Sequence, residues 1–543
     1  MTKLPTCAAN RKRFLLAFVV LIFHASLLGA ATFYVAPNGN DAWSGTLAAP
    51  NSAKTDGPFL SPPRARDALR ESKKKNASGP FVVELREGTY PLSETLVFRA
   101  EDSDSIWRAY GSERPVLSGG RVISGFQEAV VNGKKRWQTV LPEAKSGAWY
   151  FRQLFVSTKG QPWERRYRPN LGMKRVDGLT YSPRRKAASH RAAQIDFIFA
   201  PGDFKKWENL NDVEVVLLHV WSSSRLLVKE VDALRNVVTF TGMPTFAVDQ
   251  GGLQPYFIEN VKEELDASGE WYLDRPTGLL SYIPKDGESL ADSRVIAPVL
   301  STVVSLNANY SNESFVAHFV MSNLVFSHNE SALPKEGYGG SQAQPDLPSA
   351  VELVGAKECE FSRCVISQTG NYGIGIGLGC HSNRVVGCRM FDLGGGGVKV
   401  GDIQMNGINK NAKYPMLPTG NRVENCAISD GGVMYFSANA VWGGLVNGAV
   451  IAHNEIYNFP YAGMAVGWSW SDEKTSCASN RMEYNLVSNV LTLLADGASI
   501  YTLGRQPGTV IRGNVVRDNV QSVHAKFHWQ LGLYLDEGSS EML

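Results

Sequence analysis

The chain has 543 residues, of which 43% are hydrophobic and 20% are charged, and its formal net charge is +3. This composition is typical of a protein that buries a large core, and it excludes a disordered or fibrous chain. Because 543 residues exceed one ordinary compact domain, we expect several domains or an elongated repeat architecture.

Residues 1–31 have the order of a secretory signal peptide. Lys3 and the basic run 11–13 precede an apolar run over 14–28, which leads into small residues at 29–31. The apolar run is shorter than the about 20 residues that a bilayer span needs, so we expect cleavage and export rather than a membrane anchor. The segment holds four of the 55 Lys and Arg residues and none of the 52 Asp and Glu residues, leaving 51 against 52. A nearly neutral mature chain gives no electrostatic reason to expect nucleic-acid binding, and we expect a soluble monomer, secreted or periplasmic.

Residues 32–117 begin with a strand and a loop rich in Gly, Pro and Asn. A short helix over 63–72 and two strands in FVVELREGTYPLSETLVF follow, which we interpret as the cap and first coils of a solenoid. Residues 118–290 alternate apolar and polar positions without a fixed period, which predicts an inserted β-rich domain. Within it, Trp271 to Pro284 is predicted to form a hairpin that turns at Pro276 to Gly278.

Residues 291–543 contain repeats of about 30 residues. Each unit starts with Cys or Asn, alternates apolar residues, turns through Gly, Asn or Asp and continues into a second short strand. Short strands at this period, with no helix between them, favour a parallel β-helix. The first positions of the units should stack as an internal ladder of small thiols and hydrogen-bonded amides: Cys364, Cys388, Cys426, Asn454, Asn485 and Asn514. No CxxC pair or zinc-like spacing occurs, so we expect no metal and no cofactor.

A second repeated position points to chemistry. Several coils end a strand with glycine, at Gly377, Gly401, Gly443 and Gly467, whereas the aligned segments LTLLADGAS and LGLYLDEGS carry Asp496 and Asp536. Equivalent positions of adjacent coils lie about 5 Å apart, so one carboxyl group of such a pair should hold its proton tightly. An acid and a base are what glycosidic bond cleavage requires, and a short gap between them favours retention of anomeric configuration. The alternative is that both aspartates are ordinary turn residues.

Aromatic residues surround the two aspartates in the sequence. Exposed aromatic faces suit the flat C–H surfaces of sugar rings, whereas burial in the core is the alternative for each of them. The predicted substrate-binding residues are Trp442, Trp468, Trp470, Tyr501 and Glu537.

The segment LADGASIYTLGRQPGTVIRGNVVRDN, followed by GLYLDEGSS, resembles the catalytic region of glycoside hydrolase family 141. FYVAPNGND and QLFVSTKGQPWERRYRPN also resemble that family, so the resemblance covers nearly the whole mature chain. It implies a right-handed parallel β-helix interrupted by an insertion domain, with Asp496 and Asp536 at the positions of the catalytic aspartates. It further implies α-L-fucosidase or xylanase-like activity on plant or algal-type polysaccharides. The family's helix continues beyond LDEGSS, so we expect a chain truncated at its C-terminus.

Two other functions stay open at this point. A polysaccharide lyase of the same fold could recruit Arg505, Lys399 and Asp402, although no calcium-loop spacing occurs. A non-catalytic glycan-binding protein is the other alternative. The basic runs 165–168 and 184–186 could contact an acidic polysaccharide, but a solvated charged face is the simpler interpretation.

Overall fold

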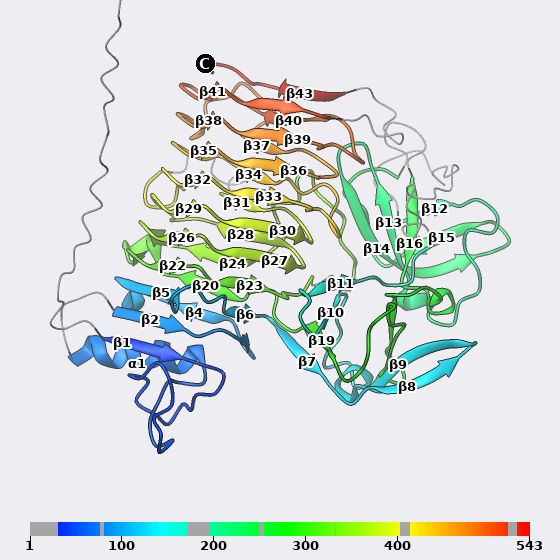
Figure 1. The fold of residues 1–543 in the computed structure, drawn as a ribbon. Helices are drawn as coiled ribbons and strands as arrows, with labels where there is room; N and C mark the ends of the chain where they lie inside the picture. Colours follow the sequence, from blue (N-terminus) through cyan, green and yellow to red (C-terminus); the bar gives the residue numbers. More distant parts are fainter. Residues whose placement is uncertain are drawn as a thin grey trace, which may run out of the picture.

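The computed structural model describes residues 31–75, 81–171, 195–248, 255–331, 333–401, 413–519 and 529–543. In these residues, three long parallel sheets stack strand on strand along one axis, and three antiparallel sheets lie beside them (Figure 1). This arrangement confirms the predicted all-β fold, a parallel β-helix interrupted by a β-rich insert. The predicted signal peptide, apart from Ala31, lies outside the described residues, as do Asp402 and the basic run 184–186.

Each coil of the β-helix gives one short strand to each long sheet. The first sheet has ten strands: β1 (Thr32–Val35), β2 (Phe81–Leu85), β5 (Ser105–Ala109), β22 (Val320–Ser322), β26 (Glu360–Ser362), β29 (Arg384–Val386), β32 (Arg422–Glu424), β35 (Val450–Ala452), β38 (Arg481–Glu483) and β41 (Val510–Arg512). The second has nine: β3 (Thr89–Pro91), β6 (Val116–Ser118), β23 (Val325–Ser327), β27 (Val365–Thr369), β30 (Arg389–Leu393), β33 (Ala427–Ser429), β36 (Glu455–Tyr457), β39 (Leu486–Ser488) and β42 (Val515–Arg517). The third also has nine: β4 (Leu96–Phe98), β20 (Val304–Asn307), β24 (Ser349–Val354), β28 (Tyr372–Ile376), β31 (Val398–Val400), β34 (Val441–Gly443), β37 (Met464–Val466), β40 (Gly497–Thr502) and β43 (Gln530–Leu535). A short pair, β21 (Val316–Ala317) and β25 (Ala356–Lys357), completes the parallel strands.

The predicted internal ladder is confirmed. The backbone N–H of Cys426 donates to Asn454 Oδ1 over 3.0 Å. Asn454 Nδ2 donates to Asn485 Oδ1, and Asn485 Nδ2 donates to Asn514 Oδ1, each over 2.9 Å. Because every amide is paired inside the stack, the polar groups are buried without loss of hydrogen bonds.

A second ladder runs just before the first sheet, and the sequence analysis missed it. The backbone N–H of Cys359 donates to Asn383 Oδ1, and Asn383 Nδ2 donates to Asn421 Oδ1. Higher in the stack, Asn480 Oδ1 accepts from the backbone of Ala449. The sequence pattern of this second ladder is weaker because Cys359 and Ala449 stand where other coils have asparagine.

The thiols of the described residues are structural. All six are buried and unpaired. Burial raises the pKa of Cys359, Cys380 and Cys477 to about 12, so these thiols stay protonated and unreactive at neutral pH.

The N-terminal end of the stack is covered by helix α1 (Pro62–Lys75), which lies below β1 in Figure 1. Its apolar side, with Ala65, Ala68 and Leu69, joins the main core. The segment expected to form two strands forms three, β2, β3 and β4, because each coil bends twice. Among the described residues, no helix is long and apolar enough to cross a membrane.

The insert lies between β6 and β20, and its antiparallel strands run from residue 120 to residue 298, past the predicted end at 290. The predicted hairpin is confirmed, with Trp271 opposite Tyr282. One sheet contains β11 (Glu164–Arg166), β10 (Leu154–Thr158), β19 (Ser293–Pro298) and β7 (Gly120–Ile123). The next contains β12 (Asp196–Ile198), β15 (Val237–Phe240), β14 (Ser223–Asp232), β13 (Glu214–Leu218) and β16 (Tyr256–Glu259). The last contains β17 (Trp271–Asp274), β18 (Leu279–Tyr282), β9 (Lys134–Val140) and β8 (Gln127–Val131), and the helix α2 (Pro142–Lys145) follows β9.

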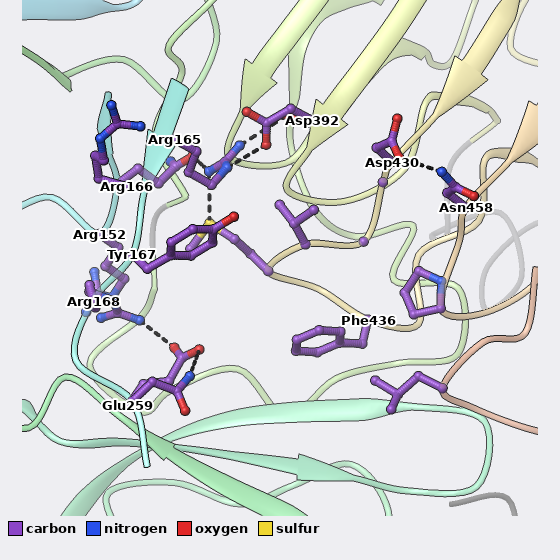
Figure 2. Close-up of a pocket in the computed structure, with 18 of the residues that line it drawn as sticks. Arg152, Arg165, Arg166, Tyr167, Arg168, Glu259, Asp392, Asp430, Phe436 and Asn458 are labelled. Carbon is purple, nitrogen blue, oxygen red and sulfur yellow. Dashed lines mark hydrogen bonds and ion pairs between the residues drawn. The ribbon is translucent and has the colours of Figure 1, made fainter. Parts of the chain in front are cut away.

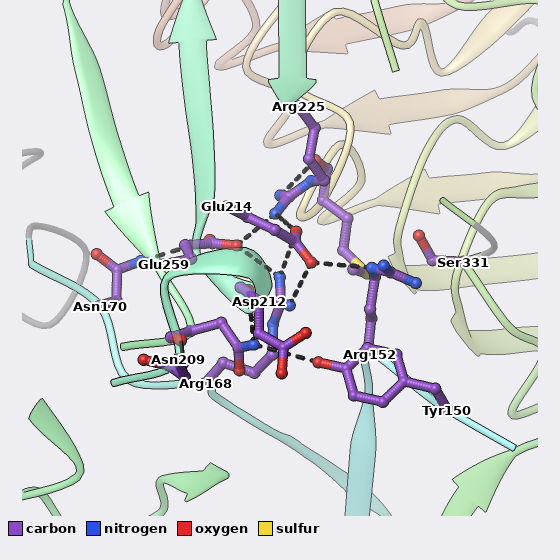
Figure 3. A network of polar contacts seen from close by, with 12 residues as sticks. Tyr150, Arg152, Arg168, Asn170, Asn209, Asp212, Glu214, Arg225, Glu259 and Ser331 are labelled. Carbon is purple, nitrogen blue, oxygen red and sulfur yellow. Dashed lines mark hydrogen bonds and ion pairs between the residues drawn. The ribbon is translucent and has the colours of Figure 1, made fainter. Parts of the chain in front are cut away.

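A buried ionic network joins the insert to the β-helix (Figure 3). Glu214, whose side chain is 0% exposed, accepts from Arg152 over 2.9 Å, from Arg168 over 2.7 and 2.8 Å, and from Arg225 over 2.9 Å. Arg168 and Arg225 also bind Glu259. Arg225 then donates to the carbonyl of Met434 in the β-helix over 3.0 Å.

The charges of this network determine the ionisation state of Glu214. Burial by itself raises the pKa of Glu214, but the positive charges of Arg168 and Arg152 outweigh it and hold that pKa well below its ordinary value. The carboxylate is therefore ionised across the neutral range, and three guanidinium groups depend on it for compensation.

We predict that Glu214→Gln lowers the free energy of unfolding by about 3–5 kcal/mol, because it leaves buried arginine charges without their anion. Urea unfolding measures this change. Glu128→Gln is the control, since Glu128 forms an exposed ion pair with Lys135, and it should change stability by less than about 1 kcal/mol. Equal stability of the two variants would contradict the role given to Glu214.

Candidate active site

The register of β40 and β43 corrects the alignment made from the sequence. Tyr501 pairs with Tyr534 and Thr502 with Leu535, so the position after β40 that corresponds to Asp536 is Leu503, not Asp496. Asp496 instead lies immediately before β40. The two aspartates are therefore not equivalent positions of adjacent coils, and the argument for a short gap between their carboxyl groups no longer holds.

Asp536 does belong to the strand-ending position that the glycines occupy. Following the register from β28 to β43 places Gly444, rather than Gly443, in that column. The full column is Gly377, Gly401, Gly444, Gly467, Leu503 and Asp536. An aspartate thus stands in the last coil where four earlier coils have glycine.

Side chains bring the two aspartates into one electrostatic site. The hydroxyl of Tyr501 donates to Asp536 Oδ2. The hydroxyl of Tyr461 donates to the backbone oxygen of Asp496 over 2.8 Å. Gln342 Nε2 donates to both phenol oxygens, over 2.9 Å to Tyr461 and 3.5 Å to Tyr501. One amide thereby links the tyrosine that holds Asp496 to the tyrosine that holds Asp536.

The two carboxyl groups differ in environment. Burial, then the charge of Asp536 and then that of Glu537 raise the pKa of Asp496 to about 6. Burial together with the charges of Asp536 and Asp496 raises the pKa of Tyr534 to about 12. Asp496 is thus a half-buried acid that holds its proton to about pH 6, and Asp536 beside it accepts a hydrogen bond from a phenol.

The aromatic residues divide into two groups. Trp442 and Trp468 are buried with Tyr501 in a cluster outside the third sheet, so the expectation of exposed faces is wrong for these three. Their rings meet edge to face, with 5.6 Å between the centroids of Trp442 and Trp468. Trp470 is 47% exposed and stands 5.4 Å from Trp468. Trp470 and the exposed Glu537 are therefore the predicted binding residues that solvent can reach.

The insert reaches the site through the turn between β13 and β14. The backbone N–H of Ala495 donates to the carbonyl of Val220 over 2.9 Å, so the turn holds the segment that carries Asp496. Sequence reasoning missed Gln342, Tyr461 and Val220, because they come from other coils or from the insert and form no motif with the aspartates. It also missed Tyr534, which lies two residues before Asp536 in the segment LGLYLDEGS.

Two of the residues considered for a lyase, Lys399 and Arg505, have other partners. Lys399 donates to the carbonyl of Pro345 over 3.2 Å and to that of Leu347, while Arg505 pairs with Glu541. Within the part of the chain that the structure describes, no group of three or more His, Cys, Asp or Glu residues could hold a metal ion.

The basic run 165–168 is not a solvated face. Arg166 binds Glu164 and Glu288, and Arg168 belongs to the buried network around Glu214. Arg165 pairs with Asp392 of the β-helix over 2.6 Å. The expectation of a solvated charged surface is therefore wrong for these three arginines, of which Arg165 connects the insert to the coils.

The comparisons with known proteins agree with this fold. Residues 349–541 match the family model described as "Right handed beta helix region". A solved structure described as "Glycoside hydrolase" has a TM-score of 0.78 and 22% identity, covering 94% of this chain and 92% of its own. "The complex structure of XylC with xylose" has a TM-score of 0.48 and 12% identity, covering 90% and 70%. The first likeness shows a shared fold, and the second is too distant to support an argument. No curated protein sequence matches significantly.

We predict that Asp496→Asn stabilises the protein above pH 6. The raised pKa means that the native state loses stability as pH rises from about 3.8, the ordinary value, to about 6. An amide carries no such cost, so the variant should gain about 1–2 kcal/mol at pH 8, after allowance for solvent screening, and nothing below pH 4. Asn also tolerates the positive φ of 54° at this position. Urea unfolding at both pH values measures the difference, and an equal gain at both would contradict this interpretation.

Proposed function

We propose that the protein is a glycoside hydrolase in which Asp496 is the general acid and Asp536 is the base or nucleophile. The observation that carries this proposal is the pairing of a half-buried acid of raised pKa, Asp496, with a second carboxylate, Asp536, that accepts the hydroxyl of Tyr501. Enzymes of this class need two carboxyl groups whose environments differ in this way.

The roles of the two aspartates follow from the raised pKa of Asp496 and the hydrogen bond that Asp536 accepts. Asp496 keeps its proton to about pH 6 and can give it to the glycosidic oxygen as the bond breaks. Asp536 has its carboxylate oriented by Tyr501, and it either attacks the anomeric carbon or takes a proton from the attacking water. Gln342 and Tyr501 are positioning residues, because they act through the carboxylates.

The substrate class rests on the resemblance to glycoside hydrolase family 141. That resemblance favours plant or algal-type polysaccharides, with an α-L-fucosidase or xylanase-like specificity. The exposed Trp470 beside the buried aromatic cluster supplies a surface for a sugar ring. The commitment of Lys399 and Arg505 to other partners gives a lyase no support.

Release of reducing sugar from pectic, xylan and fucosylated glycans tests the proposal. Asp496→Asn and Asp536→Asn should each lower the rate by at least about 100-fold, the usual contribution of acid–base catalysis. Asp518→Asn is the matched control, because Asp518 also has a positive φ, of 57°, but lies after β42 and pairs with Arg517. It should keep full activity. Undiminished activity in either catalytic variant would refute the assignment.

Nitrophenyl glycosides distinguish the two roles. Their leaving group departs without protonation, so Asp496→Asn should lose much less activity on them than on natural glycans. Asp536→Asn should be impaired on both. The reverse pattern would exchange the roles of the two aspartates, and an unsaturated product absorbing in the ultraviolet would indicate a lyase instead.

We predict that activity on natural glycans falls as pH rises through about 6. Asp496 must be protonated to act as an acid, and its pKa in the free protein is about 6. The pH dependence of kcat/KM measures this descending limb. The limb should be absent for Asp496→Asn assayed with a nitrophenyl glycoside, whereas a limb that persists there would show that another group titrates.

A further inference from the structure

A large cavity lies between the insert and the turns that follow the second sheet (Figure 2). Its volume is about 880 Å³. One wall comes from residues 165–168 of the insert, and the other from the end of β30 and the turns after β33, β36 and β39. A cavity of this size at a junction between two structural units is a usual place for a ligand.

The β-helix wall carries one polar side chain per coil. Asp392, Asp430, Asn458 and Asn489 have φ values between 48° and 60°, the left-handed turn that favours Asn and Asp. Asn458 Nδ2 donates to Asp430 Oδ1, and Asn489 Nδ2 donates to Asn458 Oδ1, each over 2.7 Å. Each amide has a second N–H, so the column can offer both donors and acceptors along the cavity at intervals of about 4.8 Å.

The opposite wall offers an aromatic face. Tyr167 is 63% exposed, and its ring extends into the middle of the cavity in Figure 2. Phe436, Pro460 and Leu493 add apolar surface on the β-helix side. A pyranose has flat C–H faces and a rim of hydroxyl groups. The aromatic and apolar side chains suit the faces, and the Asn and Asp side chains can hydrogen-bond to the hydroxyl groups.

The positive charges of the lining are paired with carboxylates. Arg165 binds Asp392, and Arg168 binds Glu259. Arg166, also in the lining, binds Glu164 and Glu288. The paired arginines give the cavity no excess of positive charge with which to select an acidic sugar.

We propose that this cavity binds a neutral oligosaccharide segment at a site separate from the aspartate pair. The polar column supplies hydrogen bonds to successive sugar units, and Tyr167 stacks on one ring. Leu493 lines this cavity, whereas Asp496, Tyr501 and Asp536 are not among its lining residues. Between Leu493 and Asp496, the backbone N–H of Ala495 donates to the carbonyl of Val220 in the insert. Binding here does not require that the protein be a hydrolase.

Hydrogen–deuterium exchange with neutral xylo-oligosaccharides and galacto-oligosaccharides locates the ligand. The protein carries Asp496→Asn so that the ligand persists if the chain is a hydrolase. We expect added protection of residues 165–168 and 430–434. Protection confined to residues 496–503 and 534–538 would overturn the proposal, and so would the absence of any protection.

Affinity measurements by calorimetry test the residues. Tyr167→Ala and Asn458→Gly should each weaken binding of the same oligosaccharides at least about fivefold. Glycine keeps the left-handed backbone at residue 458, and Asn236→Gly is the matched control because Asn236 has a φ of 53° in an insert turn away from the cavity. Tyr484→Ala controls for loss of an exposed tyrosine.

The outcomes separate cleanly. Weaker binding in both cavity variants, with unchanged affinity in both controls, supports the site even if no hydrolysis is ever detected. Unchanged affinity in the cavity variants overturns it. Tighter binding of oligogalacturonate than of neutral oligosaccharides would overturn the assigned ligand class.

Discussion

The parallel hydrogen bonding of each coil to the next is the constraint on which the rest of this structure depends. It forces equivalent residues into straight columns, because any slip of one residue would turn the apolar side of a strand outward. The amide ladder through Asn454, Asn485 and Asn514 locks that register from inside by pairing polar groups that would otherwise be buried unsatisfied. Outside, the same register sets Tyr501 beside Tyr534 and brings Asp536 to the end of its column.

The sequence could predict the repeats because they are a local pattern with a fixed period. The thiol and amide column was found for this reason, and the register bears it out from Cys364 onward. The relation between Asp496 and Asp536 could not be found in that way. The apolar residues within 491–495 have the sequence pattern of a strand. The segment is instead a loop in which Ala495 is hydrogen-bonded to Val220 of the insert, and the strand β40 starts after Asp496.

The insert was visible only as a loss of periodicity. Its ionic network around Glu214 joins residues far apart in the sequence, so no spacing could reveal that Arg168 and Arg225 share one carboxylate. Gln342 is also far in the sequence from Tyr461 and Tyr501, the two residues that it links, so no sequence motif reveals it. Pairings of this kind depend on the packing of one unit against another, which a single sequence does not encode as a motif.

The position of the insert has a consequence for how the chain folds. The third sheet has one strand, β4, before the insert, and its partner β20 comes after it, so the first coil's apolar edge stays uncovered while the whole insert is being synthesised. Closing so long a loop is entropically slow, whereas the later coils join near neighbours and can add one by one. During synthesis, therefore, the α1 cap and its strands stay without β20 until the insert has been made, and an intermediate with such an uncovered strand edge is prone to aggregation.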